Sequence, residues 1–304
     1  MAFFLITCSY GQNQKEGAST LNKYTNQIEL RHDNDFLSST DRYYSSGIFI
    51  VYRTQVNKEN DSLVNRQNTF YLGQEMYTPT DIEEVDYTKF DRPYAGFLGL
   101  YLQHTVSTNN WLFDFKYSIG VTGRISGAED FQQSFHNSAT EDSRIPTWEA
   151  QISNGFTTNI YANYIREWEL LPNPFSIHFA ISPTIAFGTK DIYFQNDLVF
   201  YFGKRNSLYK SLAYSQIGEL KNELFFAIRA GYRYVSHNTM LEGNLIKDAS
   251  MNTAVPNKNL FNYNVEIYFR RGRNDFKVFY NINSPETKDI ESHSYATLSI
   301  ARNF

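Results

Sequence analysis

Long runs in which apolar and polar residues alternate are the feature of this sequence that most limits its fold. Over residues 111–122, one face carries aromatic and aliphatic side chains and the other carries mostly polar ones. The same pattern recurs over 225–234 and 260–270. A period of two residues is typical of β-strands whose two faces meet different surroundings. The sequence therefore predicts a mostly β protein.

The length of these runs distinguishes a membrane barrel from a soluble β-sandwich. They span ten to twelve residues, which suits a tilted membrane strand, whereas strands of soluble proteins have about five or six. In an outer-membrane barrel the apolar face meets lipid and the polar face lines the interior. We therefore expect Trp111, Phe113 and Phe115 to face lipid, and Asp114 and Lys116 to face the interior.

Twelve alternating segments can be counted, and single-chain bacterial barrels have an even number of strands. The last segment ends on Phe304, a terminal aromatic residue that resembles the assembly signal of outer-membrane proteins. We predict an all-β fold, a twelve-stranded antiparallel transmembrane β-barrel in the bacterial outer membrane, with a soluble sandwich as the alternative. The segments are 25–35, 44–56, 66–78, 96–107, 111–124, 155–169, 174–188, 190–203, 222–236, 259–271, 274–284 and 293–304.

Composition excludes several other classes of protein. The sequence contains no apolar run of roughly 20 residues, which a membrane-spanning helix requires. The net charge of −4, from 28 basic and 32 acidic residues, argues against a nucleic-acid partner. The single cysteine, Cys8, excludes a disulfide within the chain. The 304 residues fit one barrel domain, and no linker interrupts them.

The first residues predict export. Residues 1–11 resemble a secretory signal segment, shortened because no basic residue precedes the apolar stretch. Leu5 to Cys8 also resembles a lipoprotein acceptor site, although Thr7 is a poor residue before the cysteine. Both interpretations leave residues 12–304 as the single outer-membrane barrel domain.

The order of the segments predicts which connections lie outside the membrane. With both termini on the periplasmic side, odd-numbered segments run outward, and outer-membrane barrels place their long loops outside. The connection 204–221 is unexpectedly long for the inner side. The predicted outer loops lie near 36–43, 79–95, 125–154, 189, 237–258 and 285–292.

The third outer loop is predicted to contain a short helix. Ser126 and Glu129 have the spacing of a capping box, and Phe131 and Phe135 are spaced to share one helical face. His136 would then lie near the helix C-terminus, whose partial negative charge favours an imidazolium. A histidine there can act as general base toward water. A solvated loop histidine is the alternative.

An oxygen-rich turn lies at the end of the first segment. Asp33, Asn34 and Asp35 supply the ligand type that calcium prefers. Their spacing is too short for a complete shell, so waters and another loop would have to add ligands. A plain turn is the alternative. Ser45 can donate a hydrogen bond to a substrate, but no G-x-S-x-G setting marks it as a nucleophile.

Several of these blocks together resemble a known family. They are Asp33 to Phe36, Thr40 to Gly47, Asp91 to Gly96, Pro146-Thr147-Trp148 with Gln151, and His237 to Gly243. Over most of the chain and in the same order, they resemble the lipid A 3′-O-deacylase family of outer-membrane proteins. The resemblance implies a twelve-stranded, calcium-dependent enzyme that hydrolyses the ester holding the 3′ acyloxyacyl chain of lipid A in the outer leaflet.

The resemblance also implies which residues form the site. The family's basic residue in the second outer loop has Lys89 as its nearest candidate. The family's acidic residue after the histidine falls on Glu141 or Asp142. The expected catalytic residues are His136, Asn34, Asp35, Ser45, Glu141 and Asp142, and the expected metal ligands are Asp35, Asp33 and Glu141.

These assignments imply a mechanism. His136 activates a water molecule, and Glu141 or Asp142 orients its ring. Asn34 and Ser45 position the ester, and a calcium ion held partly by Asp35 stabilises the oxyanion.

The expected partners are lipopolysaccharide in the outer leaflet and membrane lipid, with no nucleic acid and a monomeric chain. Two other functions stay open at this point. One is a non-catalytic barrel, a channel or surface-binding protein whose rim residues only brace loops. The other is the same hydrolase fold acting on a phospholipid.

Overall fold

A computed structural model describes residues 24–35, 42–56, 63–139, 144–218 and 221–304 of the protein. The predicted signal segment 1–11, with Cys8, lies outside these residues, and so do Glu141 and Asp142. None of the described helices has the length and apolar character needed to cross a membrane.

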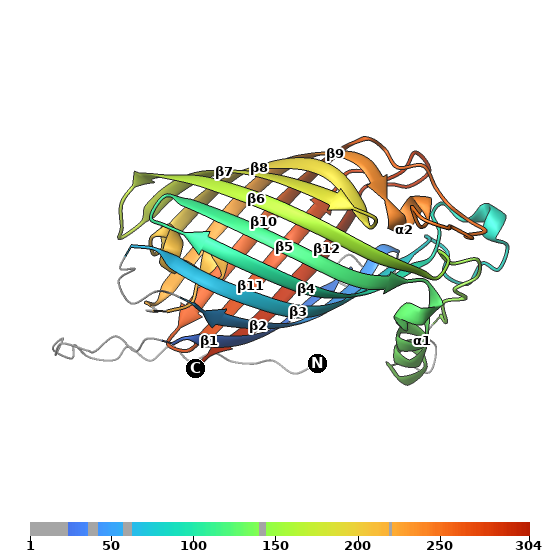
Figure 1. Ribbon diagram of the computed structural model, residues 1–304, viewed down its shortest axis with the longest axis horizontal. Helices are drawn as coiled ribbons and strands as arrows, with labels where there is room; N and C mark the ends of the chain where they lie inside the picture. The colour runs from blue at the N-terminus through green and yellow to red at the C-terminus, as the bar shows by residue number, and fades with distance from the viewer. Residues whose placement is uncertain (1–23, 36–41, 57–62, 140–143, 219–220) are drawn as a thin grey trace.

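Twelve antiparallel strands of the described chain close into a barrel, which confirms the predicted fold (Figure 1). Strands adjacent in sequence pair with one another, and the first strand pairs with the last. Closure leaves no free sheet edge, as a lipid environment requires. The strands are β1 (Asn26–Asn34), β2 (Tyr43–Gln55), β3 (Asn65–Thr78), β4 (Ala95–Ser107), β5 (Trp111–Thr122), β6 (Gly155–Leu171), β7 (Ser176–Gly188), β8 (Asp191–Lys204), β9 (Glu223–Asn238), β10 (Asn259–Arg271), β11 (Asn274–Asn283) and β12 (His293–Asn303).

The two faces of the wall differ as predicted. On β5, Phe113 and Phe115 have 40% and 46% of their surface exposed on the outside of the barrel. Lys116 lines a cavity in the interior, and Asp114 accepts a hydrogen bond from the buried Thr105. Exposed apolar side chains on the outside of a closed barrel are what lipid requires.

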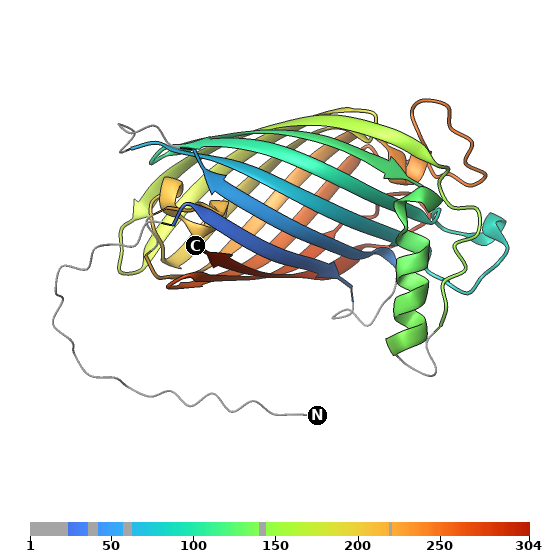
Figure 2. The ribbon, with the colours of Figure 1, turned by 60° about the horizontal axis from the view of Figure 1, so that its bottom comes forward.

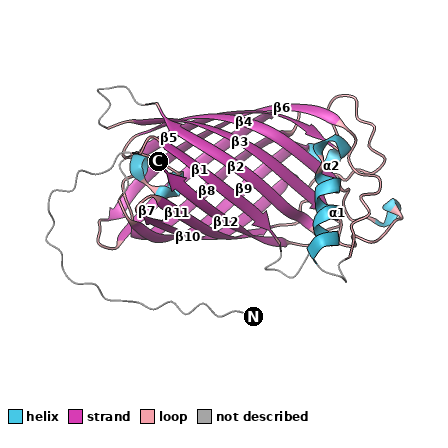
Figure 3. Cartoon of the chain, turned by 90° about the horizontal axis from the view of Figure 1, so that it is seen from below, coloured by secondary structure: helices cyan, strands magenta, loops and turns pink. Residues whose placement is uncertain are grey.

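Within the part of the chain that the structure describes, two short helices lie at the inner end of the barrel and are described below, and four helices lie at its outer end (Figure 3). The outer four are η2 (Tyr87–Lys89), η3 (Arg124–Ser126), α1 (Ala128–Ala139) and α2 (Thr239–Glu242). The helix predicted in the third outer loop is therefore present, but its capping box is not. Ser126 Oγ accepts the Ala128 N–H at 3.4 Å, whereas the Glu129 carboxylate accepts from Gln151 Nε2 at 2.7 Å.

The long inner connection folds back as a plug, which we define as residues 205–218. It contains η4 (Leu208–Lys210) and η5 (Leu212–Tyr214). Leu208 and Leu212 are fully buried and belong to one apolar cluster with side chains of the strands. The plug lies inside the inner end of the barrel, and its burial explains the unexpected length of this connection.

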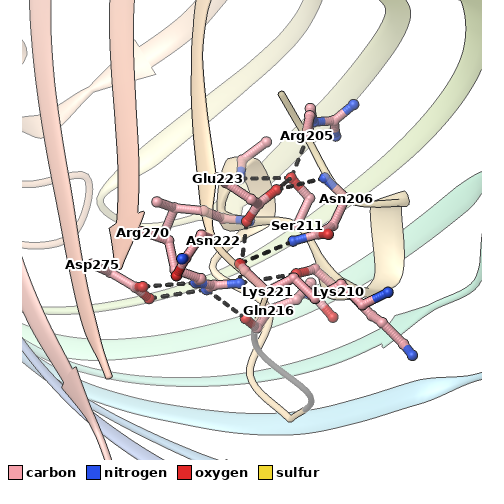
Figure 4. A network of polar contacts seen from close by, with 12 residues as sticks. Arg205, Asn206, Lys210, Ser211, Gln216, Lys221, Asn222, Glu223, Arg270 and Asp275 are labelled. Atoms are coloured by element: carbon pink, nitrogen blue, oxygen red, sulfur yellow. Dashed lines mark hydrogen bonds and ion pairs between the residues drawn. The ribbon is translucent and has the colours of Figure 1, made fainter. Parts of the chain in front are cut away.

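Buried charges fix the plug to the strands (Figure 4). Arg270 on β10 forms ion pairs with Asp275 at 2.7 Å and Glu223 at 3.2 Å, and its side chain is fully buried. The same guanidinium donates to the carbonyl oxygens of Lys210 at 3.0 Å and Gln216 at 2.9 Å. One arginine therefore joins two strands to the plug.

A second ion pair fixes the start of the plug. Arg205 donates two hydrogen bonds to the Glu167 carboxylate on β6, at 2.7 and 2.8 Å. The Tyr214 hydroxyl donates to the same carboxylate at 2.5 Å. A bidentate pair of this kind is geometrically specific, so it orients the plug as well as holding it.

Candidate active site

A pocket of about 250 Å³ lies on the outside of the barrel wall, between the outer ends of β1, β2 and β3 and the helix α1. Figure 2 shows α1 extending sideways from the wall beside these strand ends. Four of the predicted site residues line this pocket, although about a hundred residues separate the first from the last. The lining residues are His32, Asn34, Asp35, Ser45, Ser46, Ile48, Met76, Phe131, Gln132, Phe135 and His136.

The residues of the first oxygen-rich turn are divided between the outer pocket and the lumen, by strand alternation up to Asn34 and by the end of β1 before Asp35. His32 and Asn34 point outward from β1, and Asp35 follows at its end. Asp33 points into the lumen, where its carboxylate contacts Arg31 at 3.2 Å and accepts from the Tyr44 hydroxyl at 2.9 Å. The assignment of Asp33 as a metal ligand beside Asp35 is therefore corrected, because the barrel wall separates the two side chains.

A β-bulge in β2 brings two adjacent serines to the same face. The pairing register between β2 and β3 shifts between Tyr44 and Ser46, so the alternation of the strand is interrupted once. Tyr44 lines the luminal cavity, whereas Ser45 and Ser46 both line the outer pocket. The Ser45 carbonyl accepts from Asn34 Nδ2 at 3.2 Å, which joins the two strand ends at the pocket.

Gln132 is a site residue that the sequence analysis missed. Its Nε2 donates to Ser45 Oγ at 3.3 Å, and its Oε1 accepts from the indole N–H of Trp148 at 2.9 Å. Trp148 is buried and stacks on Tyr94, with ring centroids 5.2 Å apart. The available signal was helical spacing, since Gln132 precedes His136 by four residues and shares its face.

The rest of the pocket is apolar. Phe131 and Phe135 have 47% and 62% of their surface exposed on α1, and Ile48 and Met76 line the opposite side. The Phe135 and His136 rings meet edge to face with centroids 6.1 Å apart. The pocket thus combines oxygen and imidazole groups with a surface suited to hydrocarbon.

Lys89 does not line this pocket. Its ammonium contacts Glu84 at 3.0 Å and Asp86 at 3.7 Å within its own loop, and the hydrogen bond to Glu84 raises the pKa of Lys89. The Asp35 carboxylate accepts a hydrogen bond from the backbone N–H of Arg42 at 2.8 Å.

The pocket contains oxygen donors of the kind that calcium prefers, namely the Asp35 carboxylate and the Asn34 and Ser45 side chains. Across the described residues, no three His, Cys, Asp or Glu side chains are arranged to hold a metal ion. The donor chemistry therefore fits a hard cation, and further oxygen ligands would be needed to complete its shell.

Comparisons with known proteins were made for the whole chain. Residues 1–304 match the model of a family described as outer membrane protein LpxR. The solved structure of LpxR from Salmonella typhimurium is similar, with a TM-score of 0.75 and 21% identity over 91% of this chain and 100% of that chain. The β domain of the Bordetella autotransporter Brka has a TM-score of 0.49 and 10% identity over 92% and 99% of the two chains. No curated protein matches the sequence.

Proposed function

Because the chain belongs to the LpxR family of outer-membrane proteins, the lipid A 3′-O-deacylase family that its motifs resemble, we propose that it hydrolyses the 3′-linked acyloxyacyl ester of lipid A. The observation that carries this proposal is the outer pocket. There Asn34, Asp35, Ser45 and His136 meet an apolar lining on the wall that faces lipid. An acyl ester has the same combination of a polar reacting group and a hydrocarbon chain.

His136 is the proposed general base. A histidine can take a proton from water near neutral pH, and general-base catalysis contributes about 10²- to 10⁴-fold in rate. His136 lies in the last turn of α1 and lines the pocket together with Asn34 and Ser45. Glu141 or Asp142, outside the described residues, is proposed to orient the ring.

Asn34 and Ser45 are proposed to position the ester. The contact between Asn34 Nδ2 and the Ser45 carbonyl holds the two strand ends together, and Gln132 holds the Ser45 hydroxyl from the helix side. The apolar half of the pocket binds the acyl chain, with burial of each CH₂ group stabilising the complex by about 0.8 kcal/mol.

Calcium is proposed to be held by Asp35 and Asn34, with Glu141 as a further ligand. When bound, the ion supplies positive charge that stabilises the oxyanion of ester hydrolysis. Positioning of the substrate is proposed for Asn34 and Ser45, and proton transfer is proposed for His136.

Mass spectrometry of lipid A tests the proposed reaction. Lipid A from outer membranes that contain the protein should lose the mass of the 3′ acyloxyacyl group, and lipid A from membranes without it should not. Intact lipid A together with fatty acid released from phospholipid would favour a phospholipid substrate. Unchanged lipids of both kinds would favour a non-catalytic barrel.

Removal of calcium is expected to abolish activity, and added calcium should restore it. Asp35→Asn should need a higher free calcium concentration, because it removes a charged oxygen ligand. Fatty-acid release from purified lipid A measures both effects across a calcium titration. Asp130→Asn, which changes an exposed carboxylate on α1, is the control and should titrate like the parent. Activity indifferent to a chelator would contradict the role of calcium.

Gln132→Glu is expected to lower kcat about tenfold with little change in KM. Glutamate keeps an acceptor for the Trp148 indole N–H but loses the donor to Ser45, and one hydrogen bond is worth about 1 kcal/mol. Gln133→Glu is the matched control, because Gln133 donates to the Pro146 carbonyl away from the pocket. Equal kcat values for the two variants would show that the Ser45 contact does not position the site.

A further inference from the structure

The lumen contains a second cavity of about 460 Å³, separate from the outer pocket. It occupies the outer half of the barrel and reaches the outer loops through Asn238, Met240 and Glu286. A third cavity of about 380 Å³ continues inward, shares Arg31 and other lining residues with it, and ends at Ser215 of the plug. The luminal space therefore extends from the outer loops to the plug.

Most charged side chains of the outer luminal cavity are paired with one another. A buried charge without a partner is costly, so pairing is the expected state inside a barrel. The pairs within the lining are Arg31 with Asp33 at 3.2 Å, Lys190 with Glu75 at 3.2 Å and with Asp191 at 3.4 Å, and Arg229 with Asp197 at 3.4 Å. The lining residue Glu286 pairs with Arg92 at 3.1 Å.

Lys116 and Arg233 also line this cavity but differ from the ion-paired residues described above. Neither has a carboxylate within 4.0 Å among the residues that the structure describes. The Lys116 ammonium lies 4.1 Å from the centroid of the Tyr161 ring. Arg233 donates from Nε to Gln195 Oε1 at 2.6 Å, and its guanidinium carbon lies 4.5 Å from the Tyr193 ring. The cavity therefore holds two cations that are in no ion pair within 4.0 Å among the described residues, although Asp191, Asp197 and Glu286 line the same cavity.

An aromatic surface connects these two cations. Lys116 is paired in register with Tyr161, Tyr161 with Ala186, and Ala186 with Tyr193, so the four residues form one row across the wall. The small Ala186 side chain lets the two tyrosine rings approach to 6.4 Å between centroids. Arg233 lies beyond Tyr193 on the next strand. Its register partner there is Gln195, so it lies diagonally to Tyr193, and each of the two rings has one cation within 4.5 Å of its centroid.

We propose that the outer luminal cavity binds an anionic sugar, with its carboxylate or phosphate held by Lys116 and Arg233 and its ring packed on Tyr161 and Tyr193. Charge-assisted hydrogen bonds from the two cations recognise the anion, and tyrosine offers an apolar face with a polar edge to a hydroxylated ring. Amide side chains supply partners for the hydroxyl groups. These are Gln195, Asn238, Asn262, Asn264 and Asn283.

The remaining properties of the cavity favour this ligand class over others. Its volume is far larger than a bare inorganic anion needs, and its lining is mostly polar, which does not suit an acyl chain. Asp33 and Tyr44 face this cavity, whereas their neighbours Asn34 and Ser45 face the outer pocket. The luminal site is thus on the other side of the wall from the proposed ester hydrolysis and is independent of it.

Binding of small sugars to the full-length purified barrel in detergent tests the proposal. Saturation-transfer NMR and calorimetry should detect saturable binding of glucuronate, glucose 6-phosphate or both, with glucose and inorganic phosphate at least tenfold weaker. The two anionic sugars distinguish a carboxylate ligand from a phosphate ligand. Lys116→Met and Arg233→Gln should each weaken binding of the anionic sugar about tenfold, while Lys116→Arg should retain it.

Lys204→Gln is the matched control for charge, because Lys204 is exposed at the inner end of β8, and it should bind like the parent. All variants should keep the heat-modifiable gel migration of a folded barrel and unchanged release of fatty acid from lipid A. Equal affinities for glucose and glucuronate would overturn the role of the two cations. Binding of phosphate as tight as that of the sugars, or no saturable sugar binding, would overturn the assignment of a sugar site.

Discussion

Replacing His136 by alanine is expected to lower fatty-acid release from lipid A by about 10²- to 10⁴-fold, the range that general-base catalysis contributes. The barrel should stay intact, because the strands pair with one another and not through α1. The measurement is initial rate against lipid A at matched amounts of folded protein. An activity equal to that of the parent would exclude His136 as the base.

His32→Ala is the control for this experiment. His32 lines the same pocket, with its Nε2 3.2 Å from Ser46 Oγ, but it lies on β1 and not on α1. Its removal should reduce the rate much less than the loss of His136. The reverse order of effects would assign the proton transfer to His32 and overturn the proposed mechanism without changing the proposed reaction.

Replacing Arg270 by leucine is expected to lower the free energy of unfolding by about 3–5 kcal/mol, the usual cost of breaking a buried ion pair. The variant leaves the buried carboxylates of Asp275 and Glu223 without their cation. It also removes two donors to plug carbonyl groups. Urea titration of the folded band on gels measures the loss.

Arg271→Leu is the matched control, since Arg271 is the next residue of β10 and is exposed. Its urea midpoint should equal that of the parent. Planar-bilayer recording adds a second measurement: the parent should show no open-pore current, whereas Arg270→Leu should show transient current as the plug loosens. Equal urea midpoints for the two variants would show that Arg270 does not anchor the plug.

The fold could be predicted because lipid and lumen impose opposite requirements on alternate residues. Phe113 and Phe115 follow that rule on β5. The helix α1 was predictable from local spacing. The same alternation explains why the assignment of Asp33 as a metal ligand was wrong. It turns Asp33 into the lumen, whereas His32 and Asn34 face outward.

Other parts of the site were not predictable from local pattern. The bulge at Ser45 depends on the pairing register between β2 and β3, which no short segment encodes. The role of Gln132 depends on Trp148, sixteen residues away in a loop. The plug is fixed by Glu167, Glu223 and Asp275, which are scattered over three strands. Each feature follows from contacts between distant segments.

The position of the outer pocket beside α1 determines how a substrate meets the protein. The pocket lies on the wall that faces lipid, beside α1, and the plug lies inside the inner end of the barrel. Figures 1 and 2 show α1 beside the outer strand ends. Under the proposed function, the lipid substrate reaches the pocket by lateral diffusion within its own leaflet and does not cross water. The rate of encounter then depends on the concentration of substrate within the membrane surface, that is, on its mole fraction among the lipids, and not on its bulk concentration. Dilution of lipid A with inert lipid at constant bulk concentration should slow the reaction in proportion.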